Sequence, residues 1–440
     1  MNKKRLIKIL AEFCRVLLGV TFVFSGIVKA IDPIGGAIKI EEYLTAFGLN
    51  YFLWTDNLLS FSQSSIEFTL GICLLLGVYR KLTTIGVLLF MCFFTPLTLY
   101  LAIFNPVSDC GCFGDAIILS NWETFFKNLF LLVASIFTYI YHKHLASFYS
   151  YKAYWFVVLF VFFFCMAFCY QNFSHLPIKE FLPYKVGLSI PKLMEIPDDA
   201  PQEEYLFIYE KDGVKKEFVL EEAPYDDDSW SYVDKKIIKE GFIPVVSSFE
   251  LYNRNENNIA DVILSQPRLT FLLIINKIKE ANEVHIDKIN NIYDYAVESE
   301  TKFPFYGVTA SSEEDIEEWK KDTGADYPFL TADDILLKTM IRSNPGVIII
   351  KNGTILAKWH HNDIPDEDEL DEVITMLDNT QIDENNGMAP EIIAAKKQQE
   401  RISWLRIIAG FTLPLLLILM YDYFRDRHVR KKERLQTVNK

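Results

Sequence analysis

Long apolar stretches dominate the first 170 residues of the chain, and one more follows residue 400. Each is close to the ~20 residues that an α-helix needs to cross the core of a bilayer. Charged residues interrupt the first and the fourth stretch. A cleaved signal peptide is the alternative for the first, but no small-residue cleavage site is evident, so an uncleaved anchor is favoured. The six predicted spans are Leu6–Ile31, Phe61–Tyr79, Leu82–Phe104, Asn121–Tyr141, Ala153–Tyr170 and Ile402–Tyr421.

Charge is divided unevenly between these spans and the long segment that separates the last two. Between Gln171 and Glu400 the chain has 46 Asp and Glu against 23 Lys and Arg, whereas the rest of the chain has 12 against 21. An acidic globular block therefore lies between apolar segments with basic flanks. This pattern excludes a disordered chain and a simple cytosolic enzyme. It also excludes a nucleic-acid-binding protein, whose binding face is basic.

Lys and Arg gather in four of the polar segments, and such clusters mark the cytoplasmic side of a membrane protein. With six spans, all four clusters fall on one side, so the N- and C-termini are expected in the cytoplasm. The acidic block and the segments 32–60 and 105–120 are then outside. We expect a multi-pass protein of a bacterial inner membrane, with the acidic block in the periplasm. The clusters are the first eight residues, Arg80-Lys81, the connection with Lys143 and Lys152, and the tail from Arg425 to Arg434.

The acidic block shows the periodicities of strands and helices in mixed order. β-rich residues flank Asp212-Gly213, which is typical of a two-residue hairpin turn. The continuous apolar run over 269–275 suits a buried central strand, and apolar residues repeat at helical spacing over 286–296. This order predicts an α/β domain. The remaining predicted elements are a strand at 305–309, a capped helix from Ser311, a hairpin turning at Asn352-Gly353 and a helix over 365–377.

Residues 265–378 resemble a thioredoxin-like domain, because Asn344-Pro345 precedes the last hairpin, where that family has a cis-proline. The family carries its reactive cysteine after the first central strand. In this chain the corresponding stretch has no cysteine, and none occurs beyond Cys169. The resemblance therefore implies a domain that binds or positions a partner and has no thiol chemistry of its own.

All seven cysteines lie in the first 170 residues, and Cys110 and Cys112 share the loop Asp109-Cys-Gly-Cys-Phe-Gly-Asp115. On the predicted topology this loop is outside, where disulfides persist. A Cys-x-Cys disulfide is strained away from the preferred geometry, and Gly111 relieves the backbone part of that strain. Strained, exposed disulfides are comparatively oxidising and exchangeable. We therefore favour a redox pair over a structural disulfide or free thiols.

Three further groups are candidates for a role in the chemistry. Cys165 and Cys169 are spaced i, i+4 on one face of the fifth span, so they are candidate partners of the loop pair in a thiol relay. Cysteine in an apolar helix is, however, more often a packing residue. Lys29, at the outer end of the first span, is a candidate for stabilising a thiolate in the loop. His360 and His361 lack companion ligands, so a solvated strand end is favoured over a metal or proton site, and no metal site is predicted.

The first span and the cysteine loop together resemble the DoxX/MauE family. The likeness rests on the segment from Arg15 to Pro33, which contains Ser25-Gly26, and on the loop from Cys110 to Asp115. It covers about residues 1–145. The resemblance implies a link with periplasmic disulfide formation, and for the MauE branch a role in maturation of the methylamine dehydrogenase small subunit.

These observations combine into a polytopic α-helical membrane bundle, with about five N-terminal helices and one C-terminal helix, that carries a periplasmic α/β thioredoxin-like domain. The favoured function is thiol–disulfide redox or electron transfer on a periplasmic client protein through Cys110 and Cys112. A membrane acceptor such as a quinone is expected from the class of protein alone. The predicted units are 1–170 (DoxX/MauE-like membrane domain), 171–264 (β-rich linker or subdomain), 265–390 (thioredoxin-like domain) and 391–440 (transmembrane helix and basic tail).

Two other functions remain open at the level of sequence. The main alternative is a non-enzymatic membrane scaffold or adaptor whose acidic domain binds a partner. A transporter is disfavoured, because the charged residues of the spans cluster near their ends. The expected partners are a periplasmic client or redox partner protein and membrane lipids. Nucleic acid is not expected as a partner.

Overall fold

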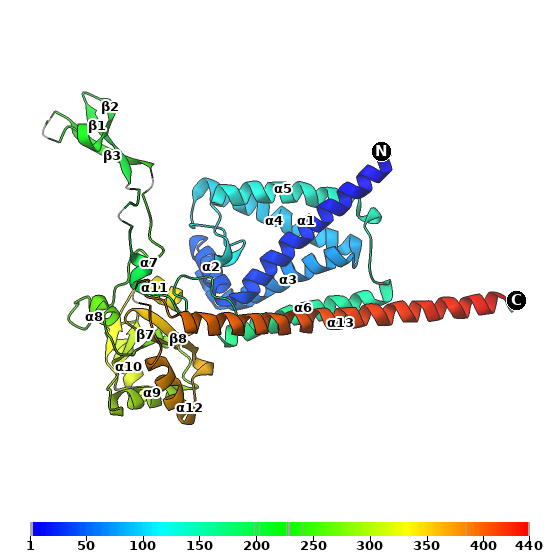
Figure 1. Ribbon diagram of the computed structural model, residues 1–440. Helices are drawn as coiled ribbons and strands as arrows, with labels where there is room; N and C mark the ends of the chain where they lie inside the picture. Colours follow the sequence, from blue (N-terminus) through cyan, green and yellow to red (C-terminus); the bar gives the residue numbers. More distant parts are fainter. Residues whose placement is uncertain are drawn as a thin grey trace.

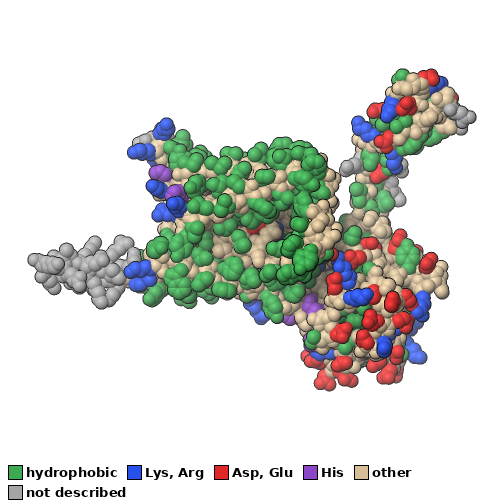
Figure 2. Space-filling view, turned by 180° about the vertical axis from the view of Figure 1, so that it is seen from behind, with side chains coloured by type: hydrophobic (Ala, Val, Ile, Leu, Met, Phe, Trp, Pro, Cys, Tyr) green, Lys and Arg blue, Asp and Glu red, His purple; other side chains and the backbone are tan. Residues whose placement is uncertain are grey.

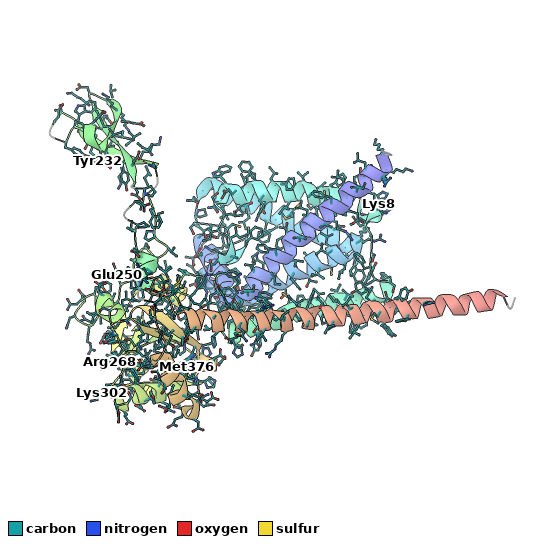
Figure 3. All side chains as sticks on the ribbon, in the orientation of Figure 1. Lys8, Tyr232, Glu250, Arg268, Lys302 and Met376 are labelled. Atoms are coloured by element: carbon teal, nitrogen blue, oxygen red, sulfur yellow. The ribbon has the colours of Figure 1, made fainter. Side chains whose placement is uncertain are left out.

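The computed structural model describes residues 3–438 apart from 198, 202, 226, 228, 240 and 384. It consists of a helical bundle, an α/β domain at one end of that bundle, and a small sheet that stands apart from both (Figure 1). Both chain ends lie at the opposite end of the bundle from the α/β domain. Figure 3 places Lys8 near that opposite end, whereas Arg268, Lys302 and Met376 belong to the α/β domain.

Five stretches of the described chain are helical, long and apolar enough to cross a membrane: Asn50–Leu76, Arg80–Phe104, Asn121–Ile140, Tyr151–Ser174 and Pro390–Arg425. They coincide with five of the six predicted spans. The span predicted over Leu6–Ile31 is a helix but is not among the five, and Glu12, Arg15 and Lys29 interrupt its apolar sequence. The helices of the bundle are α1 (Lys3–Ile31), α2 (Pro33–Ala46), α3 (Asp56–Leu76), α4 (Arg80–Phe104), α5 (Asn121–Ile140), α6 (Tyr154–Ser174) and α13 (Pro390–Val438).

The charged helix α1 nevertheless packs with one face against the bundle, in contact with α3, α5 and α6. Its approach to α3 depends on small residues, which let helix backbones come close together. A Cβ atom added to Gly26 would lie 2.5 Å from the backbone nitrogen of Phe68, and one added to Gly71 would lie 2.6 Å from that of Val23. Because α1 and α3 are so close, polar side chains from the two helices can meet in the interior.

The α/β domain is a five-stranded sheet with helices on both faces. The strand order is β6-β5-β4-β7-β8. Strands β4, β5 and β6 run parallel to one another, β7 is antiparallel to β4, and β8 is antiparallel to β7. The order resembles that of a thioredoxin-like sheet, and the Asn344–Pro345 bond is cis, as expected. The strands are β4 (Thr270–Ile275), β5 (Phe305–Thr309), β6 (Phe329–Thr331), β7 (Gly346–Lys351) and β8 (Thr354–His360), and the helices are α7 (Ile190–Met194), α8 (Ala260–Leu264), α9 (Ile286–Glu298), α10 (Glu313–Thr323), α11 (Asp334–Met340) and α12 (Glu367–Asp378).

The central strand β4 explains why its sequence is apolar without alternation. Phe271 and Leu273 face one hydrophobic core, whereas Leu272 and Ile274 face the other, and all of them are buried. A strand covered on both faces needs apolar residues at every position. The prediction of a buried central strand is therefore confirmed.

The small sheet is formed by β1 (Glu204–Lys211), β2 (Val214–Val219) and β3 (Ser231–Lys239), in the order β2-β1-β3. Lys211 pairs with Val214 across the turn at Asp212-Gly213, which confirms the predicted hairpin. Both turn residues have positive φ, which glycine adopts at no steric cost. Figure 3 shows Tyr232 on this sheet, well away from the helical bundle.

Candidate functional site

The cysteine loop between α4 and α5 owes its shape to aspartate and glycine. Asp109 accepts a hydrogen bond from the backbone N–H of Gly111 at 2.8 Å, a local turn that aspartate commonly forms. Gly111 has φ of 62°, in the left-handed region that favours glycine. A Cβ atom there would also lie 2.7 Å from Cγ of Lys39. Glycine at this position is thus required both by the backbone conformation and by the neighbouring side chain.

Side chains from two helices hold the loop in the interior of the bundle. The Tyr43 hydroxyl of α2 donates to the Cys110 carbonyl oxygen at 2.8 Å, and the Ser25 hydroxyl of α1 lies 2.7 Å from the Cys112 carbonyl oxygen. The Lys39 ammonium lies 3.1 Å from the carboxylate of Asp109. The backbone of the two cysteines is therefore anchored at both positions.

The two thiols lie side by side. Their sulfur atoms are 2.7 Å apart, both cysteines are free, and Cys110 is 7% exposed while Cys112 is partly exposed. The expectation of an exposed pair is therefore wrong for Cys110, which packs against Leu101, Val107 and Tyr43. Cys112 is the more accessible sulfur.

The surroundings make the two thiols unequal as acids. The hydrogen bond from the Cys110 thiol, together with the positive charges of Lys127 and Lys29, lowers the pKa of Cys112 to about 7 despite burial. The same hydrogen bond, together with burial, raises the pKa of Cys110. Since the thiolate is the nucleophile in thiol chemistry, Cys112 is the better nucleophile of the pair near neutral pH.

A buried polar cluster lies beside the loop. The Lys29 ammonium is 2.7 Å from the carboxylate of Glu67, and their side chains are 9% and 2% exposed. Glu67 also accepts hydrogen bonds from Ser25 at 2.6 Å and from Gln63 at 3.1 Å. Ionisable groups in a membrane bundle need such partners. Ser25 joins this cluster to the loop through its contact with the Cys112 carbonyl.

One side chain of the α/β domain reaches the same region. Nη2 of Arg342 lies 3.0 Å from the carboxylate of Asp32 and 2.9 Å from that of Asp115, the last residue of the loop. The side chains of Arg342 and Asp32 are each 9% exposed, whereas that of Asp115 is 35% exposed. Partly exposed contacts of Lys277 and Lys338 with Glu41 of α2, at 3.6 and 3.8 Å, lie nearby. The α/β domain is therefore docked over the cysteine loop by a buried arginine.

The structure brings together some of the predicted site residues and separates others. Cys110, Cys112 and Lys29 line one cavity, whereas Cys165 and Cys169 do not line it. The latter two are buried in a separate hydrophobic cluster of α6 with α3 and α13, so the geometry gives the proposed relay no support. The interpretation of the His pair as a solvated strand end is wrong for His360, which is 2% exposed.

Reasoning from the sequence did not assign three residues to the candidate site: Lys127, Glu67 and Arg342. The positive charge of Lys127 lowers the pKa of Cys112 more than that of Lys29 does, and the Lys127 ammonium lies 4.1 Å from the centroid of the Phe113 ring. The available signal was that Glu67 and Lys127 are charged residues inside apolar spans, which must find partners. No comparable signal marked Arg342, which belongs to a different domain.

Residues 7–141 match the family described as Methylamine utilisation protein MauE, and residues 203–240 match a domain of unknown function, DUF8463. The first match spans α1 to α5 with the cysteine loop. Together with the five apolar helices, it supports a multi-pass membrane protein and the MauE part of the resemblance. The DoxX part stays a prediction.

A comparison with curated proteins found no matching sequence. Among solved structures, a candidate protein disulfide isomerase from Bacteroides thetaiotaomicron matches with 14% sequence identity and a TM-score of 0.24. The match covers 29% of this chain and 82% of that chain. At a TM-score this low, the match indicates nothing about the function of this chain.

Proposed function

We propose that this protein is a membrane-embedded thiol–disulfide redox component that acts through Cys110 and Cys112. The observation that carries the proposal is the pair itself. Two free thiols lie 2.7 Å apart in one loop, and the pKa of Cys112, the more accessible one, is lowered to about 7. Both cysteines of the loop also line the cavity and Cys112 is partly exposed, whereas Cys165 and Cys169 are buried and line no part of that cavity.

The unequal thiols support an order of steps. The Cys112 thiolate attacks a sulfur of the client's disulfide, forms a mixed disulfide and releases one client thiolate. Cys110 then gives its proton to the first client thiolate and attacks the Cys112 sulfur, which releases the second client thiolate. In this direction the client disulfide becomes a dithiol, once the second thiolate has taken a proton from water, and the loop becomes a disulfide. In the reverse direction the oxidised loop converts a client dithiol into a disulfide and ends as the dithiol pair, which a membrane oxidant must then reoxidise. Cys112 is thus the entry cysteine and Cys110 the resolving cysteine.

The proposed setting is a bacterial inner membrane, with cytoplasmic termini and the α/β domain in the periplasm. Basic residues at both ends of the chain support it, because these ends lie opposite the α/β domain (Figure 1). The loop lies at the same end as that domain, since Asp115 contacts Arg342. We assign the α/β domain, which has no cysteine, the task of positioning the loop and its client protein.

The test compares Cys110→Ser with Cys92→Ser in intact cells. Cys92 is exposed on α4 and does not line the cavity that contains the pair. Differential alkylation of periplasmic proteins should show altered thiol–disulfide states in cells with Cys110→Ser and unaltered states with Cys92→Ser.

The scaffold function makes the opposite prediction for the same cells. Suppose that Cys110→Ser left all periplasmic thiols unchanged, whereas deletion of residues 187–390 had the same effect on the cells as loss of the whole protein. The protein would then act as an adaptor. The burial of Cys110 and the buried Arg342–Asp32 contact are the observations that favour this second candidate.

A further inference from the structure

The cysteine pair forms part of the wall of a cavity of about 530 Å³ inside the helical bundle. This volume lies within the roughly 300–1,000 Å³ typical of small-molecule sites. Phe22, Phe90 and Phe94 line it, and the centroids of the Phe22 and Phe90 rings are 5.2 Å apart. Aromatic rings of this kind favour a flat ring by stacked or edge-to-face contact. The cavity is therefore suited to a planar, largely apolar molecule.

The mouth of the cavity faces the lipid-exposed side of the bundle. Leu59 and Ile66 of α3 and Phe93 of α4 line the cavity and are also 43%, 44% and 65% exposed on the surface of the protein. Figure 2 shows that the visible face of the bundle is mostly apolar and has a hollow in which atoms of acidic side chains can be seen. A mouth framed by apolar side chains admits molecules dissolved in the bilayer more readily than molecules dissolved in water.

The inner end of the cavity is polar. Cys112, Lys29 and Glu67 line it together. The Lys29 ammonium donates to Glu67 at 2.7 Å and to Ser25 at 3.3 Å, so two of its three N–H groups are used among the described residues. The third N–H is available to a carbonyl oxygen of a bound molecule. A ligand that reaches this end also lies beside the Cys112 sulfur.

We propose that this cavity binds a quinone from the bilayer and that the quinone oxidises the Cys110–Cys112 pair, an inference that rests on the proposed redox function. The apolar walls take the ring and its tail, and Lys29 donates to a ring carbonyl. Oxidation of the pair breaks two S–H bonds, forms one S–S bond and releases two electrons and two protons. Reduction of the quinone to the quinol takes up the same two electrons and two protons in two O–H bonds, so no further reactant is needed.

Binding is tested on the full-length protein in detergent with decylubiquinone, whose fully substituted ring does not add thiols. With the pair oxidised no turnover occurs, and equilibrium binding should be saturable. Leu97→Trp fills the cavity and should weaken binding at least tenfold. Leu99→Trp, on the same helix but outside the cavity lining, should bind as the wild type does. Ile66→Trp at the exposed mouth should also weaken binding and serves as the second variant if Leu97→Trp fails to fold.

Turnover is tested with the dithiothreitol-reduced protein under anaerobic conditions. One quinol should form per Cys110–Cys112 pair. A pair that cycles with dithiothreitol, in a protein that neither binds nor reduces decylubiquinone, would overturn this inference and leave the proposed function intact. A cavity that holds only a lipid acyl chain and binds no quinone would likewise overturn this inference and leave the proposed function intact. A pair that does not cycle even with dithiothreitol would overturn both.

Discussion

Arg342 should act as the clamp between the two domains, and replacing it with methionine tests this. Arg342→Met keeps an apolar stem of similar length but leaves the carboxylate of Asp32, 9% exposed, without its cation. Breaking a buried ion pair by removing one partner costs roughly 3–5 kcal/mol. Asp115 adds little, because it is a third exposed.

The lower end of that range is the better expectation. Asp32 keeps one hydrogen bond after the substitution, because it accepts from the backbone N–H of Gly35 at 2.8 Å at the start of α2. About 3 kcal/mol corresponds to roughly a hundredfold change in an equilibrium constant. The docked state should therefore lose about that factor relative to the open state.

Hydrogen exchange measures this opening, because backbone amides at the junction exchange when the domains part. Segments 32–36 and 109–116 should exchange about a hundredfold faster in Arg342→Met, whereas the interiors of α4 and α5 should not change. Arg342→Lys keeps the charge but loses the two-pronged geometry, so its exchange rates at the junction should lie between those of the wild type and those of Arg342→Met.

Arg254 is the matched control for this experiment. It pairs with Glu313 and Glu317, but its side chain is 69% exposed, so Arg254→Met should change stability and exchange very little. Unchanged exchange at the junction in Arg342→Met, or an equal effect of Arg254→Met, would refute the clamp.

Three further predictions concern the loop. Alkylation of Cys112 in the wild type should rise with pH with a midpoint of about 7, because only the thiolate reacts. Lys127→Met removes a cation that favours the thiolate, so the midpoint should move to higher pH. An unmoved midpoint would contradict the electrostatic account. Gly111→Ala should displace the loop and change the alkylation rate, because it meets Lys39 as well as an unfavourable φ, whereas Gly324→Ala, with φ of 70° and no neighbour within 4 Å, should leave that rate alone; equal rates would show that the contact is unimportant. Cys165→Ser should leave the midpoint potential of the loop pair unchanged, and a shifted potential would restore the relay.

Local features of the fold follow directly from the sequence. The spans were predictable because about 20 apolar residues in a row have few other uses in a folded protein. The hairpin turns at Asp212-Gly213 and Asn352-Gly353 were predictable because both positions of such a turn need a positive φ, which Gly, Asn and Asp adopt most readily. The apolar run of β4 signalled a strand buried on both faces. Each of these signals lies within a few consecutive residues.

The site depends on packing between distant segments, which short-range signals do not encode. Lys29, Glu67 and Lys127 come from α1, α3 and α5, and only the close crossing of α1 and α3 makes the first two a pair. The cysteine loop was recognisable from its composition, but its burial was not, because α2 and Tyr43 close over it. Arg342 lies 227 positions from Asp115, so nothing local points from one to the other.

Redox titration of the purified full-length protein, read by alkylation and mass spectrometry of each cysteine, shows whether Cys110 and Cys112 form a redox-active pair. We predict that Cys110 and Cys112 change together from alkylated to protected in a single two-electron transition as the buffer becomes more oxidising. The buried cysteines Cys73, Cys165 and Cys169 should keep one state throughout. A loop pair that stays reduced, or stays oxidised, across the whole range of potentials would contradict a redox role for this protein.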